Sequence, residues 1–256
     1  MDTTSPERLA YYMLKKVNKA GRTYDLLADG DRIAVAVSGG KDSNTLLDLL
    51  HRRRGVERCH LVAVHVLTGG EACPVTVDLA ELERWLRELG VEYVPVPMES
   101  ATGQPRREGQ SPCFHCAWRR RKALFLAAQR LGCNKVALGH NADDVAQTTL
   151  LNLVYHGRLE TMAARVDFFD GEITVIRPLY FVPEKEIVRY VRAGGVPVMA
   201  GPCPVASRSR RAAMVRILRL LEQQNPRVKI ALLRAVERVS PTMTSASPDH
   251  FRKAGS

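Results

Sequence analysis

The fold of this chain is decided by residues 33–43, which read Ile33-Ala34-Val35-Ala36-Val37-Ser38-Gly39-Gly40-Lys41-Asp42-Ser43. The apolar run is typical of a buried strand, and it stops at two glycines. Asp42 and Ser43 then begin a periodic stretch that predicts a helix over 42–54. Such a turn points several backbone N–H groups at one spot, where the helix dipole favours negative charge. The sequence therefore predicts a phosphate or pyrophosphate site on Ser38–Ser43.

The turn differs from the best-known phosphate-binding loops. A Walker A loop needs Gly, four residues and then Gly-Lys-Ser/Thr, but Val35 occupies the first glycine position and Asp42 follows Lys41. The six residues Ser38–Ser43 instead resemble the pyrophosphate loop of the ATP-pyrophosphatases, which cleave ATP to AMP and pyrophosphate. An ordinary strand-to-helix turn is the alternative, because Gly and Ser are common in turns.

Composition limits the class of protein. The chain has 256 residues, of which 45% are hydrophobic, so it can bury a core and form one or two domains. The net charge of +11 favours a polyanionic partner such as nucleic acid, although solubility alone is the alternative. No apolar run approaches the about 18 residues that span a membrane, and the N-terminus is polar. We therefore expect a cytoplasmic protein without a membrane partner.

Short apolar runs alternate with amphipathic stretches along the first two thirds of the chain. Strands are predicted over 32–37, 61–66, 92–96, 135–138 and 173–176, and helices over 7–20, 42–54, 76–89, 114–131 and 143–155. The alternation predicts an α/β fold with a doubly wound, mostly parallel sheet. Ligands of such sheets bind beyond the carboxyl ends of the strands. Gly39 and Gly139 both follow predicted strands, so we expect them to face one site.

The last third of the chain has a different pattern. Helices are predicted over 183–193, 207–223 and 227–239, and the polar tail from Ser240 is expected to fray. Residues 98–112 lack periodicity and predict a loop. We therefore expect a nucleotide-binding domain over 1–180 and a small C-terminal helical region over 181–256.

Three cysteines form a candidate metal or redox site. Cys113 and Cys116 make a C-x-x-C at a predicted helix start, and Cys203 lies in a loop between two prolines. The alternatives are a redox pair, a zinc site and an iron–sulfur site. The order of the predicted elements differs from that of a thioredoxin-like fold and disfavours the redox pair. The lack of a second C-x-x-C disfavours a four-ligand zinc site. The other cysteines are Cys59, Cys73 and Cys133. We expect them to occupy small hydrophobic or loop positions and to have no chemical role.

Charged clusters accompany these cysteines. Arg119–Lys122 follows Cys116 on the same helix, and Arg208, Arg210 and Arg211 follow Cys203. Four successive helical positions point in all directions, so some of these side chains can face RNA and others the ATP site. We expect an RNA-binding rim, with a solvated charged face as the alternative.

Asp143 and Asp144 stand at the start of the predicted helix over 143–155. Asp is a normal residue of an N-cap or a first helical turn. The functional alternative is a contact with ATP or Mg²⁺, which prefers oxygen ligands, and Asp42 can serve the same metal.

Together these segments resemble the tRNA 2-thiocytidine synthetase family over roughly residues 8–240. The matching elements are Ser38–Ser43, Cys113-x-x-Cys116 with Arg119–Arg121, Ala137-Leu138-Gly139-His140 with Asp143, Asp144 and Thr148, Leu151-Asn152, Ile176-Arg177-Pro178-Leu179 with Glu184 and Ile187, and Cys203 before Arg211. The resemblance implies a pyrophosphate-loop fold that uses ATP and Mg²⁺. It also implies a [4Fe-4S] cluster held by Cys113, Cys116 and Cys203.

The activity that the resemblance implies is thiolation of tRNA. ATP would activate C2 of an anticodon-loop cytidine by adenylating the oxygen that C2 carries, and sulfur from a cysteine desulfurase or from sulfide would displace AMP at C2. ATP would lie on Ser38–Ser43 and Gly139, with Asp42, Asp144 and Arg120 in the chemistry. A homodimer is the expected assembly if the chain is not a monomer.

Two other functions are compatible with the sequence. A 2-thiouridine synthetase would use the same fold, whereas a lysidine-type ligase would not need the three cysteines. A non-catalytic RNA-binding module with a structural metal is the alternative from another class, and the intact loop Ser38–Ser43 argues against it.

Overall fold

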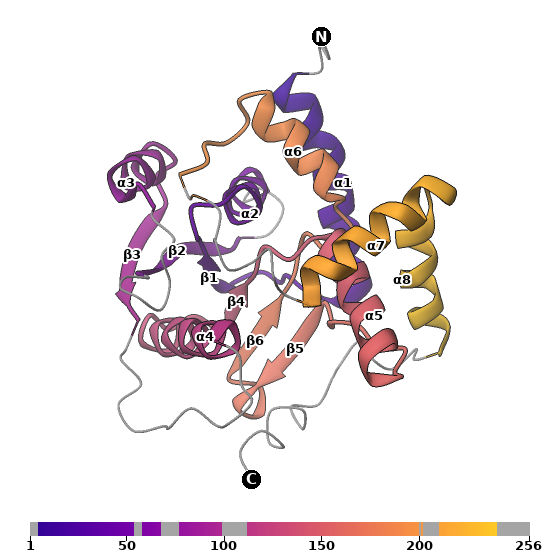
Figure 1. Ribbon diagram of the computed structural model, residues 1–256. Helices are drawn as coiled ribbons and strands as arrows, with labels where there is room; N and C mark the ends of the chain where they lie inside the picture. The colour runs from indigo at the N-terminus through magenta and orange to yellow at the C-terminus, as the bar shows by residue number, and fades with distance from the viewer. Residues whose placement is uncertain are drawn as a thin grey trace.

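The computed structural model describes residues 5–53, 58–67, 77–98, 112–199, 201 and 210–239, and for 112–115 it describes the backbone alone. A six-stranded sheet in the order β3-β2-β1-β4-β6-β5 forms the centre of this part of the chain (Figure 1). Its strands are β1 Arg32–Ala36, β2 His60–Leu67, β3 Glu92–Pro97, β4 Lys135–Ala137, β5 Arg165–Phe168 and β6 Ile173–Ile176. All neighbours pair in parallel except β5 and β6. The predicted α/β fold with a mostly parallel sheet is confirmed.

Helices cover both faces of the sheet. They are α1 Pro6–Tyr24, α2 Lys41–Arg52, α3 Leu79–Glu88, α4 Pro112–Arg130, α5 Ala142–His156, α6 Glu184–Arg192, α7 Arg210–Gln224 and α8 Val228–Val239, with a short 3-10 turn η1 at Phe169–Gly171. In Figure 1, α4 lies on one side of the strands, and α1, α2 and α6 lie on the other. Since successive side chains of a strand point to opposite faces of the sheet, one apolar strand contributes to the hydrophobic cores on both faces. Ile33 and Val35 pack on the α1–α2 side, and Ala34 packs on the α4 side.

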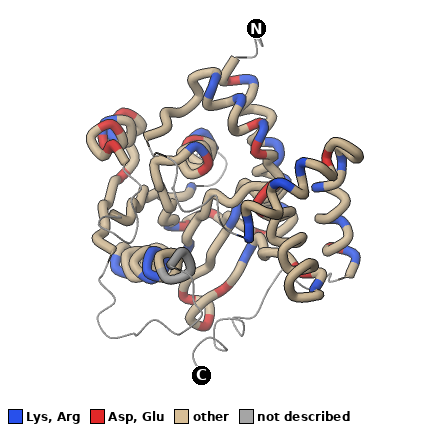
Figure 2. The backbone as a smooth tube through the Cα atoms, viewed as in Figure 1, with Lys and Arg blue, Asp and Glu red and all other residues tan. Residues whose placement is uncertain are grey.

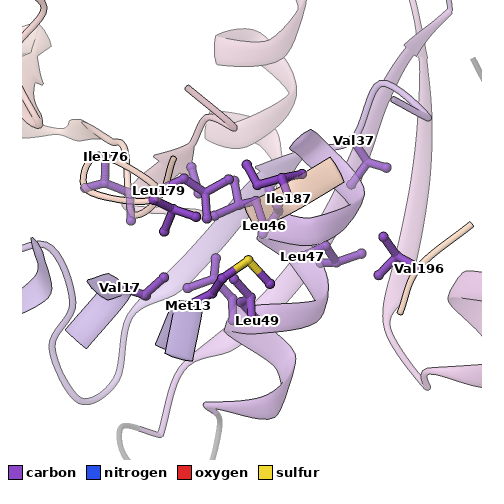
Figure 3. Close-up of a cluster of buried hydrophobic side chains, with 14 of the residues drawn as sticks. Met13, Val17, Val37, Leu46, Leu47, Leu49, Ile176, Leu179, Ile187 and Val196 are labelled. Atoms are coloured by element: carbon purple, nitrogen blue, oxygen red, sulfur yellow. The ribbon is translucent and has the colours of Figure 1, made fainter. Parts of the chain in front are cut away.

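The larger hydrophobic core joins the N-terminal helix to the segments after the sheet. Figure 3 shows Met13 of α1, Leu46 and Leu47 of α2 and Ile187 of α6 in one buried cluster. Tyr190 of α6 is also fully buried there, and its hydroxyl donates a 2.6 Å hydrogen bond to Asp48 of α2. The two helices also meet at their starts, where Lys41 of α2 pairs with Glu184 of α6 at 2.9 Å.

The structure corrects some predicted bounds. The helix predicted over 76–89 begins at Leu79, because the Asp78 carboxylate caps it by accepting from the backbone N–H of Glu81 at 2.9 Å. The strand β5 was not predicted. It is an antiparallel edge strand of only 4 residues, and its alternation of charged Arg165 and Asp167 with apolar Val166 and Phe168 is too short to stand out in the sequence.

Several predictions concern residues outside the described part of the chain. They are the predicted loop over 98–112, of which only residues 98 and 112 are described, the tail from Ser240, and the cysteines Cys73 and Cys203. Within the described part, no helix combines the length and the apolar character that crossing a membrane requires.

Candidate active site at the carboxyl edge of the sheet

The turn between β1 and α2 has the geometry of an anion-binding loop. Gly39 has a φ of +76°, which side-chain-bearing residues rarely adopt. Gly40 is the N-cap of α2 and offers no side chain to the N–H groups of the first turn. These groups therefore point to a ligand or to water. The helix begins at Lys41, one residue earlier than predicted.

Two serines of the loop hold its shape. The Ser43 hydroxyl accepts from the backbone N–H of Ser38 at 3.0 Å and donates to the Gly40 carbonyl at 3.0 Å. The Ser38 and Ser43 hydroxyl oxygens are 3.0 Å apart, so they also share a hydrogen bond. These contacts close the turn around its own backbone and fix where its N–H groups point.

Lys41 carries the positive charge of the loop. Its ammonium group donates to Asp42 Oδ2 at 2.7 Å and to Glu184 Oε1 at 2.9 Å. Burial alone would lower the pKa of Lys41, but these two carboxylates raise it above its ordinary value. Lys41 is therefore protonated at neutral pH and tied to α6 through Glu184.

The end of β4 approaches this loop closely. A Cβ atom at Gly139 would lie 3.1 Å from the backbone carbon of Asp42 and 3.1 Å from the backbone nitrogen of Ser43. Only glycine leaves enough space there for the two backbones. The structure thus brings Gly139 to the same place as Gly39 and Gly40, as the strand ends predicted.

Asn141, not an aspartate, is the N-cap of α5. Its side-chain oxygen accepts from the backbone N–H groups of Asp143 and Asp144, at 2.9 and 3.2 Å. Asp144 Oδ2 in turn accepts from the Asn141 backbone N–H at 3.0 Å, which completes a capping box. Both aspartates therefore lie in the first helical turn, where the sequence placed them.

The two aspartates differ in their surroundings. Asp143 accepts from the Glu184 backbone N–H at 2.7 Å and pairs with Lys229 of α8 at 2.6 Å, so it joins α5 to two other helices. Burial raises the pKa of Asp144, with the Asn141 N–H and Arg211 acting against it and Asp42 acting with it. Asp144 is thus the carboxylate that shares its environment with Asp42.

Arg120 of α4 lies near enough to His65 of β2 for its charge to act on that imidazole. This charge and, more strongly, burial lower the pKa of His65, whose Nδ1 lies 2.8 Å from the Val37 carbonyl oxygen. Because a carbonyl only accepts, Nδ1 carries the proton. Val37 is the residue before the loop, so Arg120 of α4 acts on a histidine that contacts the strand leading into the loop, and its catalytic role stays a prediction.

The segment after α6 runs along the loop, which the sequence did not reveal. The Met199 backbone N–H donates to the Gly39 carbonyl at 2.9 Å, and the Asn44 side chain donates to the Pro197 carbonyl at 2.8 Å. Residues 196–199 are thereby fixed against the start of α2. The chain leads from this segment toward Cys203.

The structure describes the predicted cysteine site only in part. Cys113 and Cys116 are three residues apart in α4, and such positions share one face of a helix. The Cys113 side chain and Cys203 are outside the described residues, and within those no three His, Cys, Asp or Glu residues are grouped to hold a metal. Cys133 is buried, which raises the pKa of its thiol, and Cys59 forms no disulfide.

His140 and Arg177 stand in motifs quoted above for the family resemblance, but their sequence context indicated no role in the site for either of them. Burial, with Arg177, Arg211 and Arg121 nearby, lowers the pKa of His140 to about 3. Burial and Arg121 lower the pKa of Arg177 to about 10. These residues come from four separate elements, so no local pattern could have grouped them.

The described residues fit a nucleotide with Mg²⁺. The loop offers backbone N–H groups and one ammonium, and the missing Cβ of Gly139 leaves room for the backbone to approach. Asp42 and Asp144 supply the oxygen atoms that Mg²⁺ prefers. The site therefore defines the class of the protein as a nucleotide-binding enzyme of the pyrophosphate-loop type.

Comparison with known proteins agrees with this class. Residues 9–217 match the family described as the PP-loop domain. The chain is 42% identical over 242 residues to the tRNA-cytidine(32) 2-sulfurtransferase of Geobacter sulfurreducens, covering 92% of this chain and 93% of the relative. It is 41% identical, with the same coverage, to the enzyme of that name from Citrifermentans bemidjiense.

A solved structure is also similar. It is the U34-tRNA thiolase NcsA from Methanococcus maripaludis with its [4Fe-4S] cluster, at a TM-score of 0.74 and 28% identity over 93% of this chain and 80% of that chain. The chain belongs to the PP-loop family and, within it, to the tRNA-cytidine(32) 2-sulfurtransferases.

Proposed function

We propose that this chain is an ATP-dependent tRNA sulfurtransferase that replaces O2 of an anticodon-loop cytidine by sulfur. Position 32 is the position named for the relatives. The single observation that carries the proposal is the close approach of Gly139 to the start of α2, because it would let two strand ends form one phosphate site.

ATP would lie on Ser38–Ser43 and beside Gly139. Lys41 would exchange its contacts with Asp42 and Glu184 for contacts with the phosphates, since its ammonium already lies at the loop. Asp42 is held by Asn141 at 3.0 Å, and Asp144 lies close enough for the Asp42 charge to act on its pKa. The two carboxylates would hold Mg²⁺ next to the phosphates.

The reaction would proceed in two displacements. The cytidine O2 would attack the α-phosphorus of ATP, forming an adenylated base and releasing pyrophosphate. Sulfur would then attack C2, and AMP would leave with the former O2. Arg120 would stabilise the charge that develops on the α-phosphate, because preorganised cations act strongly in a site shielded from water.

Cys113, Cys116 and Cys203 would hold a [4Fe-4S] cluster. When bound by three thiolates, such a cluster supplies an iron site that can carry a nucleophilic sulfur. The first two cysteines are one turn apart in α4. The Met199 backbone N–H donates a hydrogen bond to Gly39 of the loop. Cys203 comes four residues after Met199, and four residues of extended chain span at most about 14 Å. Chain connectivity therefore limits how far the third thiolate can be from the loop.

Three further expectations belong to this proposal. The sulfur donor would be a cysteine desulfurase or sulfide, because the reaction consumes one sulfur atom for each base. The cytoplasm would be the compartment, since it contains the tRNA. A homodimer would be the assembly if the chain associates with itself.

The proposal is tested by nucleoside analysis of tRNA from a strain that lacks the gene. Mass spectrometry should show loss of 2-thiocytidine, and a plasmid copy of the gene should restore it. Unchanged 2-thiocytidine would contradict the proposal, as would loss of 2-thiouridine in its place.

A further inference from the structure

Buried nitrogen atoms without partners mark the edge of the sheet next to the nucleotide site. Among the described residues, His140 Nδ1 and Arg177 Nε are shielded from solvent and have no hydrogen-bond partner. Native proteins rarely leave such groups unpaired, because burial removes the water that would otherwise satisfy them. Each such group in a native structure calls for a ligand, an ion or a water.

These two residues leave adjacent strand ends. His140 follows β4 and Arg177 follows β6, and the backbone N–H of Leu138 donates to the Ile176 carbonyl at 2.9 Å between them. Another arginine, Arg119 of α4, also has a buried and unpartnered Nε within the described part of the chain. Unpartnered buried nitrogens are therefore found both after the strands and on the helix that covers them.

Two more arginines complete the site at its rim. Arg121 of α4 and Arg211 of α7 are exposed, and both are near enough to His140 for their charges to act on it. Arg211 also reaches the Thr148 hydroxyl of α5 at 3.3 Å. We name His140, Arg177, Arg121 and Arg211 the guanidinium pocket. Three positive charges act on one imidazole there, and among them Arg211 also acts on the Asp144 carboxylate.

We propose that the guanidinium pocket binds one backbone phosphate of the tRNA substrate, next to the nucleotide that is thiolated. The inference rests on the proposed function. Guanidinium groups pair with phosphate oxygens through two parallel hydrogen bonds, which a point charge such as lysine cannot do. A phosphate would partner the unsatisfied donors and neutralise the arginines in one step.

A phosphate of RNA fits better than a phosphate of ATP. The ATP phosphates already have the loop with its own cation, Lys41. The helices α4 and α7 that carry Arg121 and Arg211 hold further Lys and Arg residues, whose positions along the backbone are blue in Figure 2. A long polyanion uses such a continuous basic surface, whereas a nucleotide does not need it. The exposed basic residues on these two helices include Lys122, Arg210, Arg216 and Arg219.

The test removes one phosphate charge at a time. Full-length tRNA carrying a single neutral methylphosphonate is prepared for each linkage of the anticodon loop, and its affinity for the intact protein is measured. For wild type, one linkage beside the target cytidine should weaken binding about tenfold, the size expected for a charge-assisted pair. The variants Arg177→Gln and Arg211→Ala should bind unmodified tRNA about tenfold more weakly and be insensitive to that linkage.

The matched control is Arg87→Ala. Arg87 is an exposed arginine of α3 that pairs with Glu83, away from the pocket. This variant should retain the wild-type response to every linkage. Because Arg211 is exposed, its variant keeps the test valid even if replacement of Arg177 impairs folding, which a thermal melt would reveal.

Affinity for ATP separates the two sources of phosphate. Calorimetry with Mg-ATP should give equal affinities for wild type and both pocket variants. The inference would be overturned by a pocket variant that loses ATP affinity while its tRNA affinity still falls, as for wild type, when one phosphate is neutralised. It would also be overturned if no single methylphosphonate weakened tRNA binding to the wild-type protein. Wild-type protein that shows the response but forms no thionucleoside would instead contradict the proposed function and leave the phosphate site intact.

Discussion

The Asn141 side-chain amide donates a 3.0 Å hydrogen bond to Oδ1 of Asp42, which joins the cap of α5 to the first turn of α2. The oxygen of the same amide caps α5. One side chain therefore sets the position of the Asp42 carboxylate and the start of the helix that carries Asp144.

We predict that Asn141→Ala lowers stability and, separately, ATP affinity. Loss of the cap should cost about 1 kcal/mol, which chemical denaturation measures. The affinity for Mg-ATP should fall in addition, because Asp42 loses the partner that orients it. The control is Asp78→Ala, which removes the cap of α3 and should cost similar stability without a change in ATP affinity. Equal ATP affinities for the two variants would refute this role of Asn141.

Gly139→Ala should damage the loop through its new Cβ. The methyl group would press on the backbone of Asp42 and Ser43, so the loop must shift or the protein must lose about 1–3 kcal/mol of stability. Pyrophosphate release from ATP in the presence of tRNA should fall with it. Gly21→Ala is the control, because a Cβ there meets its nearest atom at 3.8 Å and Ala is the better helix former. Full activity of Gly139→Ala would show that the close approach is dispensable.

His140 should make the protein sensitive to mild acid. Its pKa is lowered to about 3 in the folded state, so the unfolded chain binds a proton below about pH 6.5 that the folded chain does not bind. The stability that neutral His140 contributes is therefore fully present above about pH 6.5, and it is lost progressively as the pH falls toward 3. Between pH 7 and pH 5 the loss from this one group should be about 2 kcal/mol.

Denaturation at several pH values checks this expectation. The variant His140→Gln should lose about 2 kcal/mol less than wild type between pH 7 and pH 5. His60→Gln removes a histidine that is mostly exposed, and it should follow the wild-type curve. Parallel curves for wild type and His140→Gln would show that His140 does not titrate in this way.

Iron content should depend on three cysteines alone. Protein purified without oxygen should contain iron and sulfide, and replacement of Cys113, Cys116 or Cys203 by Ser should remove most of both, because each thiolate is a ligand. Cys133→Ser is the matched control, since that cysteine is buried in the core beside α4. Iron retained by Cys203→Ser and lost by Cys133→Ser would reverse the assignment.

The sequence predicted the sheet and the loop because their signals are local. Apolar runs ending at Gly39 and Gly139 are visible in a few residues, and comparison with relatives confirms the family that those motifs indicated. The edge strand β5 escaped prediction because its alternation of charged and apolar residues is only 4 residues long. The division of the chain at residue 180 stays a prediction.

The site was harder to predict because distant residues build it. Asp143 and Asp144 are equivalent in sequence, and only the contacts of Asp143 with Lys229 and Glu184 separate a structural aspartate from the one beside Asp42. The guanidinium pocket likewise depends on helices that meet only in the folded chain. The catalytic and ligand roles of the individual residues stay predictions, including those of Cys113 and Cys203.

The most direct measurement uses purified protein, reconstituted with iron and sulfide without oxygen, and unmodified tRNA. With ATP, Mg²⁺ and a sulfide source, nucleoside mass spectrometry should detect 2-thiocytidine, and release of one pyrophosphate for each thiolated base. No product should form without ATP. Iron-loaded protein that binds tRNA and ATP but yields no 2-thiocytidine would contradict the account.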